Sequence, residues 1–188
     1  MYSYIKGIVT VVSPKNITLE NNKIGYEIVV PNPYNFIVSD EEITVFIYHY
    51  LREDQETLYG FKTNEEKDLF LKLIQVNGIG PKSALSILAS ASVNEIINAI
   101  ESRNDAYLKR FPGIGAKASQ QIILDLHGKI SFDDLSSNFT VSGHAKDIEE
   151  ALVTLGYSKK DVTKVVSKLD LTLDDSTLIK LALKELNK

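Results

Sequence analysis

Apolar residues alternate with polar ones along the first third of the chain. This alternation, or an apolar β-branched run, marks five segments: Ile5–Val12, Ile17–Glu20, Ile24–Val30, Ile43–Leu51 and Thr57–Phe61. Turn residues such as Ser13-Pro14 and Asn21-Asn22 separate the segments. Five short strands joined in this way predict a small closed barrel, such as an OB-fold, over residues 1–62. Gly7 and Gly25 fall inside strands, where bulges or tight bends are expected.

From residue 63 the apolar positions follow a helical period, and residues 63–130 are predicted to form an all-helical domain. The first helix has its core stripe at Leu69, Phe70, Leu73 and Ile74. We expect Asn64 to cap this helix and Ser92 to cap a later one. Gly128 is expected to close the last helix of the segment.

Polar and small residues then crowd residues 131–142, which predicts a flexible linker. Three short helical patterns follow in residues 143–188, with Ser158 and Asp174 as expected N-caps. Leu155, Gly156 and Tyr157 make the first turn between these helices. The residues themselves favour a helix stop with Leu155 and Tyr157 packed in the core. The alternative is an apolar patch that receives a partner helix.

The helical segment contains a repeat, because a Gly-Ile-Gly-x-Lys sequence at residues 78–82 recurs at residues 113–117. Two glycines around one apolar residue predict a tight turn, and the second glycine opens the next helix. Free amides at a helix N-terminus attract anions, phosphate above all. Each copy resembles the helix-hairpin-helix motif, which grips the sugar-phosphate backbone of DNA. The candidate DNA-binding residues are Gly78, Gly80, Lys82, Ser83, Gly113, Gly115, Lys117 and Ala118.

The net charge of −4 is unusual for a DNA-binding protein. Residues 63–130 are the only net-positive third, with 8 basic and 7 acidic side chains. Binding would therefore depend on focused sites of amides and lysines, multiplied by oligomerisation. The only arginines are Arg52, Arg103 and Arg110, so reading of guanine edges is not expected.

Nothing in the sequence predicts catalysis, a metal site or a cofactor. The chain has no cysteine, and His49, His127 and His144 are scattered. Neither glycine repeat has the spacing of a nucleotide-binding P-loop. The start of the chain lacks a signal-peptide layout and no apolar run is long enough to span a bilayer, so a cytoplasmic setting without membrane attachment is expected.

Glu53 and Asp54 follow Arg52 between the fourth and fifth predicted strands, at a hairpin tip. On the residues alone, a solvated charged turn is the favoured interpretation. The alternative is electrostatic, because carboxylates beside a phosphate-binding surface would repel DNA strands.

The order of these parts resembles the RuvA family of Holliday junction-binding subunits over the whole chain. The resemblance rests on Arg52-Glu53-Asp54 followed by Leu58-Tyr59-Gly60-Phe61, on Gly25-Tyr26-Glu27, on both hairpins, and on Leu155-Gly156-Tyr157. It implies an α+β multidomain protein with three parts: an OB-fold barrel that oligomerises, a central domain with two helix-hairpin-helix motifs, and a small three-helix, UBA-like C-terminal domain.

The resemblance also implies a function. A homotetramer, or an octamer on DNA, would hold a four-way junction open, with Glu53 and Asp54 as an acidic pin. Residues 143–188 would bind the hexameric ATPase RuvB through Leu155, Gly156 and Tyr157, and the RuvC resolvase is a further candidate partner. Ala116 and Gln120-Gln121 depart from the family pattern and are expected to weaken the second hairpin.

Two other functions stay open. A DNA-repair nuclease or glycosylase could use the same hairpins, with Asp125 as the only acidic residue on the following helix. A single-strand-binding barrel is the third hypothesis, although Tyr26, Tyr34 and Tyr48 show no stacking pattern.

Overall fold

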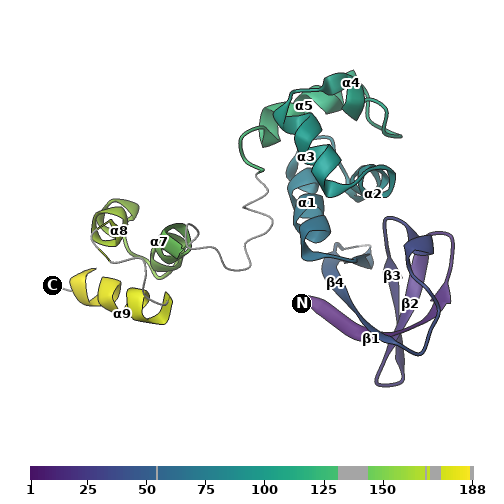
Figure 1. Ribbon diagram of the computed structural model, residues 1–188, viewed down its shortest axis with the longest axis horizontal. Coiled ribbons are helices and arrows are strands. Elements are labelled where there is room, and N and C mark those ends of the chain that lie inside the picture. Colours follow the sequence, from purple (N-terminus) through teal and green to yellow (C-terminus); the bar gives the residue numbers. More distant parts are fainter. Residues whose placement is uncertain (54, 131–143, 168, 170–174, 187–188) are drawn as a thin grey trace. The chain divides into compact units, whose positions relative to one another are not determined.

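The structure is a computed structural model that describes residues 1–53, 55–130, 144–167, 169 and 175–186 (Figure 1). The chain divides into two compact units, Met1–Ser136 and Ser137–Lys188. The linker predicted at residues 131–142 lies outside the described residues.

The first unit begins with a closed five-stranded barrel of the predicted kind. Its strands are β1 (Tyr4–Val12), β2 (Asn16–Asn21), β3 (Ile24–Val29), β4 (Glu42–Leu51) and β5 (Glu56–Phe61). They follow each other around the barrel in the order β1-β2-β3-β5-β4, and β1 pairs with β4 to close it. The seam between β3 and β5 is parallel and short, with Ile28 opposite Leu58 and Val29 opposite Tyr59. Alternate apolar residues fill the interior, including Ile17, Leu19, Val45 and Ile47 at 0% exposure.

Of the two alternatives expected at Gly7 and Gly25, a bulge or a tight bend, the bulge was wrong for both. The register of β1 shifts instead between Val9 and Val11, whereas Gly25 pairs regularly with Glu20. Gly7 is needed for a different reason, since an added Cβ would collide with the carbonyl oxygen of Glu20. The glycine permits close approach of β2 rather than a break in pairing.

Among the described residues of the first unit, a 3-10 helix η1 (Pro33–Asn35) lies between β3 and β4, and five α-helices follow the barrel: α1 (Asn64–Gln75), α2 (Pro81–Ser90), α3 (Val93–Glu101), α4 (Asp105–Leu108) and α5 (Ala116–Leu126). Of the predicted stripe on α1, the side chains of Leu69, Phe70 and Leu73 are fully buried, and Ile74 is partly buried against the same core. Phe70 also contacts the barrel, because its ring lies 4.9 Å from that of Phe61 and 5.3 Å from that of Tyr59. Barrel and helices therefore share one apolar cluster, which joins them into a single unit.

The cap of α1 differs from the prediction. Thr63, not Asn64, is the N-cap, and its hydroxyl accepts from the amide of Glu66 at 3.3 Å. Asn64 is the first residue inside the helix, and its side-chain amide donates to Asp68 at 2.7 Å. Burial raises the pKa of the Asp68 carboxyl. Two neighbouring residues competed for one capping position, and the sequence alone did not distinguish them. The predicted cap at Ser92 is confirmed, with a complete capping box to Glu95.

The second unit consists of α7 (His144–Thr154), α8 (Lys159–Val166) and α9 (Asp175–Leu186) among its described residues. Ile148, Leu152, Val162, Val166, Leu178 and Ala182 form its buried core. Ser158 caps α8 as predicted, whereas Asp174 lies outside the described residues.

Within the described ranges no single helix is long and apolar enough to cross a membrane. The pair α2 and α3 meets that test together, but the two helices are bent by 105° relative to each other.

Candidate nucleic-acid interface

The two glycine repeats form hairpins with the same backbone hydrogen bonds. In the first, Val76 N donates to Leu73 O, Ile79 N to Val76 O and Ala84 N to Gly80 O, at 3.0–3.1 Å. In the second, Phe111 N donates to Leu108 O, Ile114 N to Phe111 O and Ser119 N to Gly115 O, at 2.9–3.2 Å. Each bond of the second hairpin lies 35 residues after its counterpart, so the repeat in sequence is a repeat in geometry. The apolar residues between the glycines, Ile79 and Ile114, are 5% exposed and anchor the turns.

The first glycine of each hairpin is required by the backbone itself. Gly78 has φ 85° and Gly113 has φ 82°. These values lie in the left-handed region, where an L side chain adds strain. These two glycines therefore shape the turn, whatever the turn binds.

The fold does not require a glycine at the second glycine position of each hairpin. Gly80 and Gly115 have φ −96° and −91°, which any residue can adopt. An added Cβ at either position would meet no atom within 4 Å. Both residues are exposed and stand at the N-cap of the following helix. Open space above a helix N-terminus is what close approach of a ligand backbone needs.

Helices α2 and α5 have no side chain that caps the N-terminus, unlike other helices among the described residues. The caps of α1, α3, α4 and α8 are Thr63, Ser92, Asn104 and Ser158, each accepting a backbone N–H. No side chain caps α2 or α5 in this way. Their N-terminal amides therefore have no side-chain cap, and the positive end of the helix dipole lies behind them.

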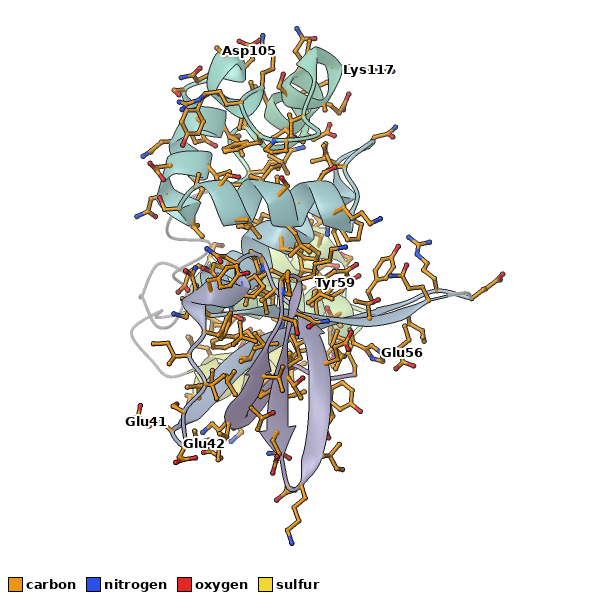
Figure 2. The ribbon with its side chains drawn as sticks, turned by 90° about the vertical axis from the view of Figure 1, so that its right-hand side faces the viewer. Glu41, Glu42, Glu56, Tyr59, Asp105 and Lys117 are labelled. Carbon is orange, nitrogen blue, oxygen red and sulfur yellow. The ribbon has the colours of Figure 1, made fainter. Side chains whose placement is uncertain are left out.

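Figure 2 shows Lys117 at the helical end of the first unit, opposite Glu41 and Glu42 of the barrel. Lys82 and Lys117 are exposed beside these helix ends, whereas Ser83 and Ala118 are partly buried. The two hairpins lie side by side, since a Cβ on Gly113 would be 3.8 Å from the hydroxyl oxygen of Ser83. All eight residues named from the sequence therefore belong to one neighbouring pair of turns.

A groove of about 270 Å³ connects the pair. Its lining comes from both copies: Asn77 and Gly78 from the first hairpin, and Lys117, Ala118 and Gln121 from the second. Asn77 was not among the candidate DNA-binding residues, and Gln121 was expected only to weaken the second hairpin. Gln121 donates from its amide nitrogen to both carboxylate oxygens of Asp125 at 2.9 Å. Asp125, the candidate acid of a glycosylase or nuclease, is thus engaged along its own helix.

The second hairpin carries cations before its turn as well as after it. Lys109 forms an ion pair with Asp105 at 2.6 Å, and this hydrogen bond lowers the pKa of the Asp105 carboxyl. The guanidinium of Arg110 lies 5.5 Å from the centre of the Tyr107 ring. The first hairpin has Ile74 and Gln75 at the matching positions. The absence of lysine at Ala116 therefore does not leave the second hairpin without charge.

The acidic turn lies where the sequence places it. Glu53 is exposed between β4 and β5, and Asp54 lies outside the described residues. The backbones of Arg52 and Gln55 bond to each other across the hairpin at 2.8 and 3.4 Å. In Figure 2 this hairpin extends beyond the barrel from the strand that carries Glu56.

The turn at Leu155, Gly156 and Tyr157 corrects one interpretation. Leu155 is 62% exposed, so its assignment to the core was wrong. Tyr157 is partly buried and packs against the core of the second unit. Gly156 has φ 100°, and the amide of Tyr157 donates to Leu152 O at 3.2 Å. The turn thus directs Leu155 outward while Tyr157 anchors it.

Among the described residues no group of three histidine, cysteine or carboxylate side chains could hold a metal ion. Glu56, near the acidic turn, accepts a 2.8 Å bond from His49 instead.

Comparison with known families and proteins agrees with this architecture. Residues 1–60 match the RuvA N-terminal domain, residues 70–127 a SAM-like tandem helix-hairpin-helix, and residues 143–187 the RuvA C-terminal domain. A relative from Acholeplasma laidlawii is 49% identical over 183 residues, covering 97% of both chains. One from Staphylococcus saprophyticus is 48% identical, covering 94% of this chain and 93% of its own. One from Listeria monocytogenes is 46% identical over the whole of both chains. Each of the three is named a Holliday junction branch migration complex subunit RuvA.

Proposed function

The chain belongs to the RuvA family, and from this premise we propose that it binds four-way DNA junctions as the non-catalytic subunit of a branch migration complex. In this role it holds the junction open for recombination and repair, and a partner ATPase supplies the energy for migration. The expected setting is the cytoplasm.

One observation carries the proposal most strongly. Two neighbouring helix N-termini have no side-chain cap, and each begins at a glycine that the fold itself does not require. Such a position suits a backbone phosphate, which accepts from the amides of Lys82 and Ser83 or of Lys117 and Ala118. The lysine side chains add charge but no sequence reading, because they contact phosphate rather than base edges.

Oligomerisation compensates for the lack of a strong positive charge on a single subunit. One subunit offers two hairpins, and a net charge of −4 gives it no broad basic surface. A homotetramer would bring eight hairpins to one junction, and each further hairpin would then bind at high effective concentration. We infer that the barrel, residues 1–62, provides the contacts between subunits. An octamer on DNA would double the number of hairpins.

The acidic hairpin tip fits the centre of such an assembly. Glu53 is exposed beyond the barrel, and Asp54 follows it in the sequence. At the branch point these carboxylates would repel the phosphates of separating strands and guide each strand into its arm. They would act as a pin that directs strands, not as catalytic acids.

The C-terminal unit is proposed to recruit the motor RuvB. Leu155 is exposed on a turn fixed by Gly156 and Tyr157, which gives a partner an apolar anchor. A junction resolvase such as RuvC is a further candidate partner for the DNA-bound form.

The proposal is tested by comparing a four-way junction with a linear duplex of equal length and sequence. We expect the junction to bind more tightly, with a mass for the complex that corresponds to four or eight subunits. Equal affinity for the two DNAs would refute the proposal.

Two variants separate the roles of the parts. Deleting residues 143–188 should leave junction binding unchanged and abolish stimulation of RuvB. Glu53→Gln with Asp54→Asn should keep or tighten junction binding but alter branch migration, because strand repulsion is removed. Persistent stimulation in the first variant, or markedly weaker binding in the second, would contradict the assigned roles.

A further inference from the structure

Arg52 stands at the base of the acidic tip and is held in place by Tyr50. Its Nε donates to the hydroxyl of Tyr50 at 3.0 Å, and its Cζ lies 5.2 Å from the centre of the same ring. A hydrogen bond and a stacking contact to one side chain restrict a guanidinium more than either contact alone. Arg52 is exposed, so this cation is ordered without being buried.

Tyr50 in turn belongs to an aromatic cluster that fixes its position. Its ring lies 6.3 Å from that of Tyr48 and 5.9 Å from that of Tyr59. Both Tyr48 and Tyr59 contact Phe70 of α1, at 5.8 and 5.3 Å. Burial, and then the neighbouring hydroxyls of Tyr50 and Tyr48, raise the pKa of Tyr59. A continuous chain of rings therefore connects the core of the first unit to Arg52.

This cluster also fixes the direction in which Arg52 faces. Tyr48 and Tyr50 are two apart on β4 and share one face of the strand, and Arg52 lies on the same side because it contacts Tyr50. That face meets α1, the helix that leads into the first glycine hairpin. His49 lies on the opposite face with its partner Glu56. Arg52 is consequently on the side of the hairpin turned toward the helical domain that carries the phosphate sites.

We propose that Arg52 binds a backbone phosphate at the branch point of the junction, with Tyr50 as the residue that positions it. With Nε engaged on Tyr50, the two terminal nitrogens form a planar fork that suits a phosphate. The hairpin tip would then have two roles: Glu53 repels a DNA strand, and Arg52 binds the strand that has turned into its arm. This inference rests on the proposed junction-binding function.

The test measures affinity for a four-way junction and for the matched linear duplex over a series of salt concentrations. Arg52→Gln should weaken junction binding about tenfold, because a charge-assisted hydrogen bond to phosphate is removed. Duplex binding should not change, since a duplex has no branch point. The slope of log affinity against log salt on the junction should fall by about one for each phosphate that is no longer neutralised.

Tyr50→Phe keeps the ring and the charge of Arg52 but removes the hydroxyl that holds Nε. It should weaken junction binding about threefold, a smaller loss than that of Arg52→Gln, because the charge-assisted hydrogen bond to phosphate remains. The slope of log affinity against log salt should not change. Arg52→Lys should also keep the slope while lowering affinity, because a point charge lacks the fork. A purely structural role for Tyr50 would instead lower affinity for both DNAs together.

Arg103→Gln is the matched control, because Arg103 is also an exposed arginine whose Nε donates to a ring side chain, that of His127, at 3.3 Å. It should leave the ratio of junction to duplex affinity unchanged. If the wild type prefers the junction and Arg52→Gln keeps that preference in full, the inference about Arg52 is wrong and the proposed function stands. If the wild type binds both DNAs equally, both fail.

Discussion

The two hairpins of the helical domain have one backbone and two sets of side chains. Their hydrogen bonds, their positive-φ glycines and their buried isoleucines match position by position. After the turn, the first has Pro81, Lys82 and Ser83, and the second has Ala116, Lys117 and Ala118. What is common to both is therefore the presentation of main-chain amides beside one lysine, and the side chains on either side of that lysine vary. The predictions below alter either the common backbone or the differing side chains.

The largest effect is expected from closing the space above both helix N-termini. Gly80→Ala with Gly115→Ala should weaken junction binding about a hundredfold, at roughly tenfold or 1.4 kcal/mol for each phosphate site. The new methyl groups meet no protein atom within 4 Å, so they would occupy only the space of the ligand. Fluorescence anisotropy with a labelled junction measures the affinity. Thermal unfolding should show little change, and a large loss of stability would contradict the account.

The other pair of glycines should behave in the opposite way. Gly78→Ala with Gly113→Ala forces alanine into φ near 85° and should cost about 1–2 kcal/mol of folding free energy at each site. Denaturant unfolding of the variant measures this cost directly. If this pair proved neutral for stability while the Gly80 and Gly115 pair did not, the division between shaping and binding glycines would be wrong.

The sequence alone could predict the hairpins but not this division of labour. The repeat at 35-residue spacing located both turns, and alternation located all five strands of the barrel. Which glycine needs its conformation and which needs its open space depends on φ and on the atoms around each position, and the residue types of the motif specify neither. The residue types likewise did not distinguish Thr63 from Asn64 as the cap of α1, or show that the turn at Gly156 directs Leu155 outward.

The hydroxyl of Ser83 is the next difference between the hairpins. Ser83→Ala should weaken junction binding about fivefold, and Ala118→Ser should tighten it by a similar factor, since one hydrogen bond contributes about 1 kcal/mol. The two variants control for each other, because each substitution gives one hairpin the side chain that the other has at the matching position. Titration of both variants under identical salt checks the prediction. Changes of the same sign in both would show that the hairpins do not bind phosphate in equivalent ways.

The smallest effect is expected from restoring charge to the second hairpin. Ala116→Lys should tighten binding a few-fold at low salt and steepen the salt dependence by about one unit for each further phosphate that is neutralised. Ala116 is exposed, so the lysine can be accommodated without repacking. Affinity measured from low to high salt would detect the change. An unaltered slope would mean that this position faces away from the DNA.

The amide resonances of the two helix N-termini provide the most direct test of the central claim. In a transverse-relaxation-optimised NMR spectrum of the deuterated full chain, a four-way junction should shift the amide protons of Lys82, Ser83, Lys117 and Ala118 downfield, as expected when an N–H donates to phosphate. The amides of Glu66 and Glu95, which already donate to Thr63 and Ser92, should not move. Junction binding without shifts at the four hairpin amides would contradict the account.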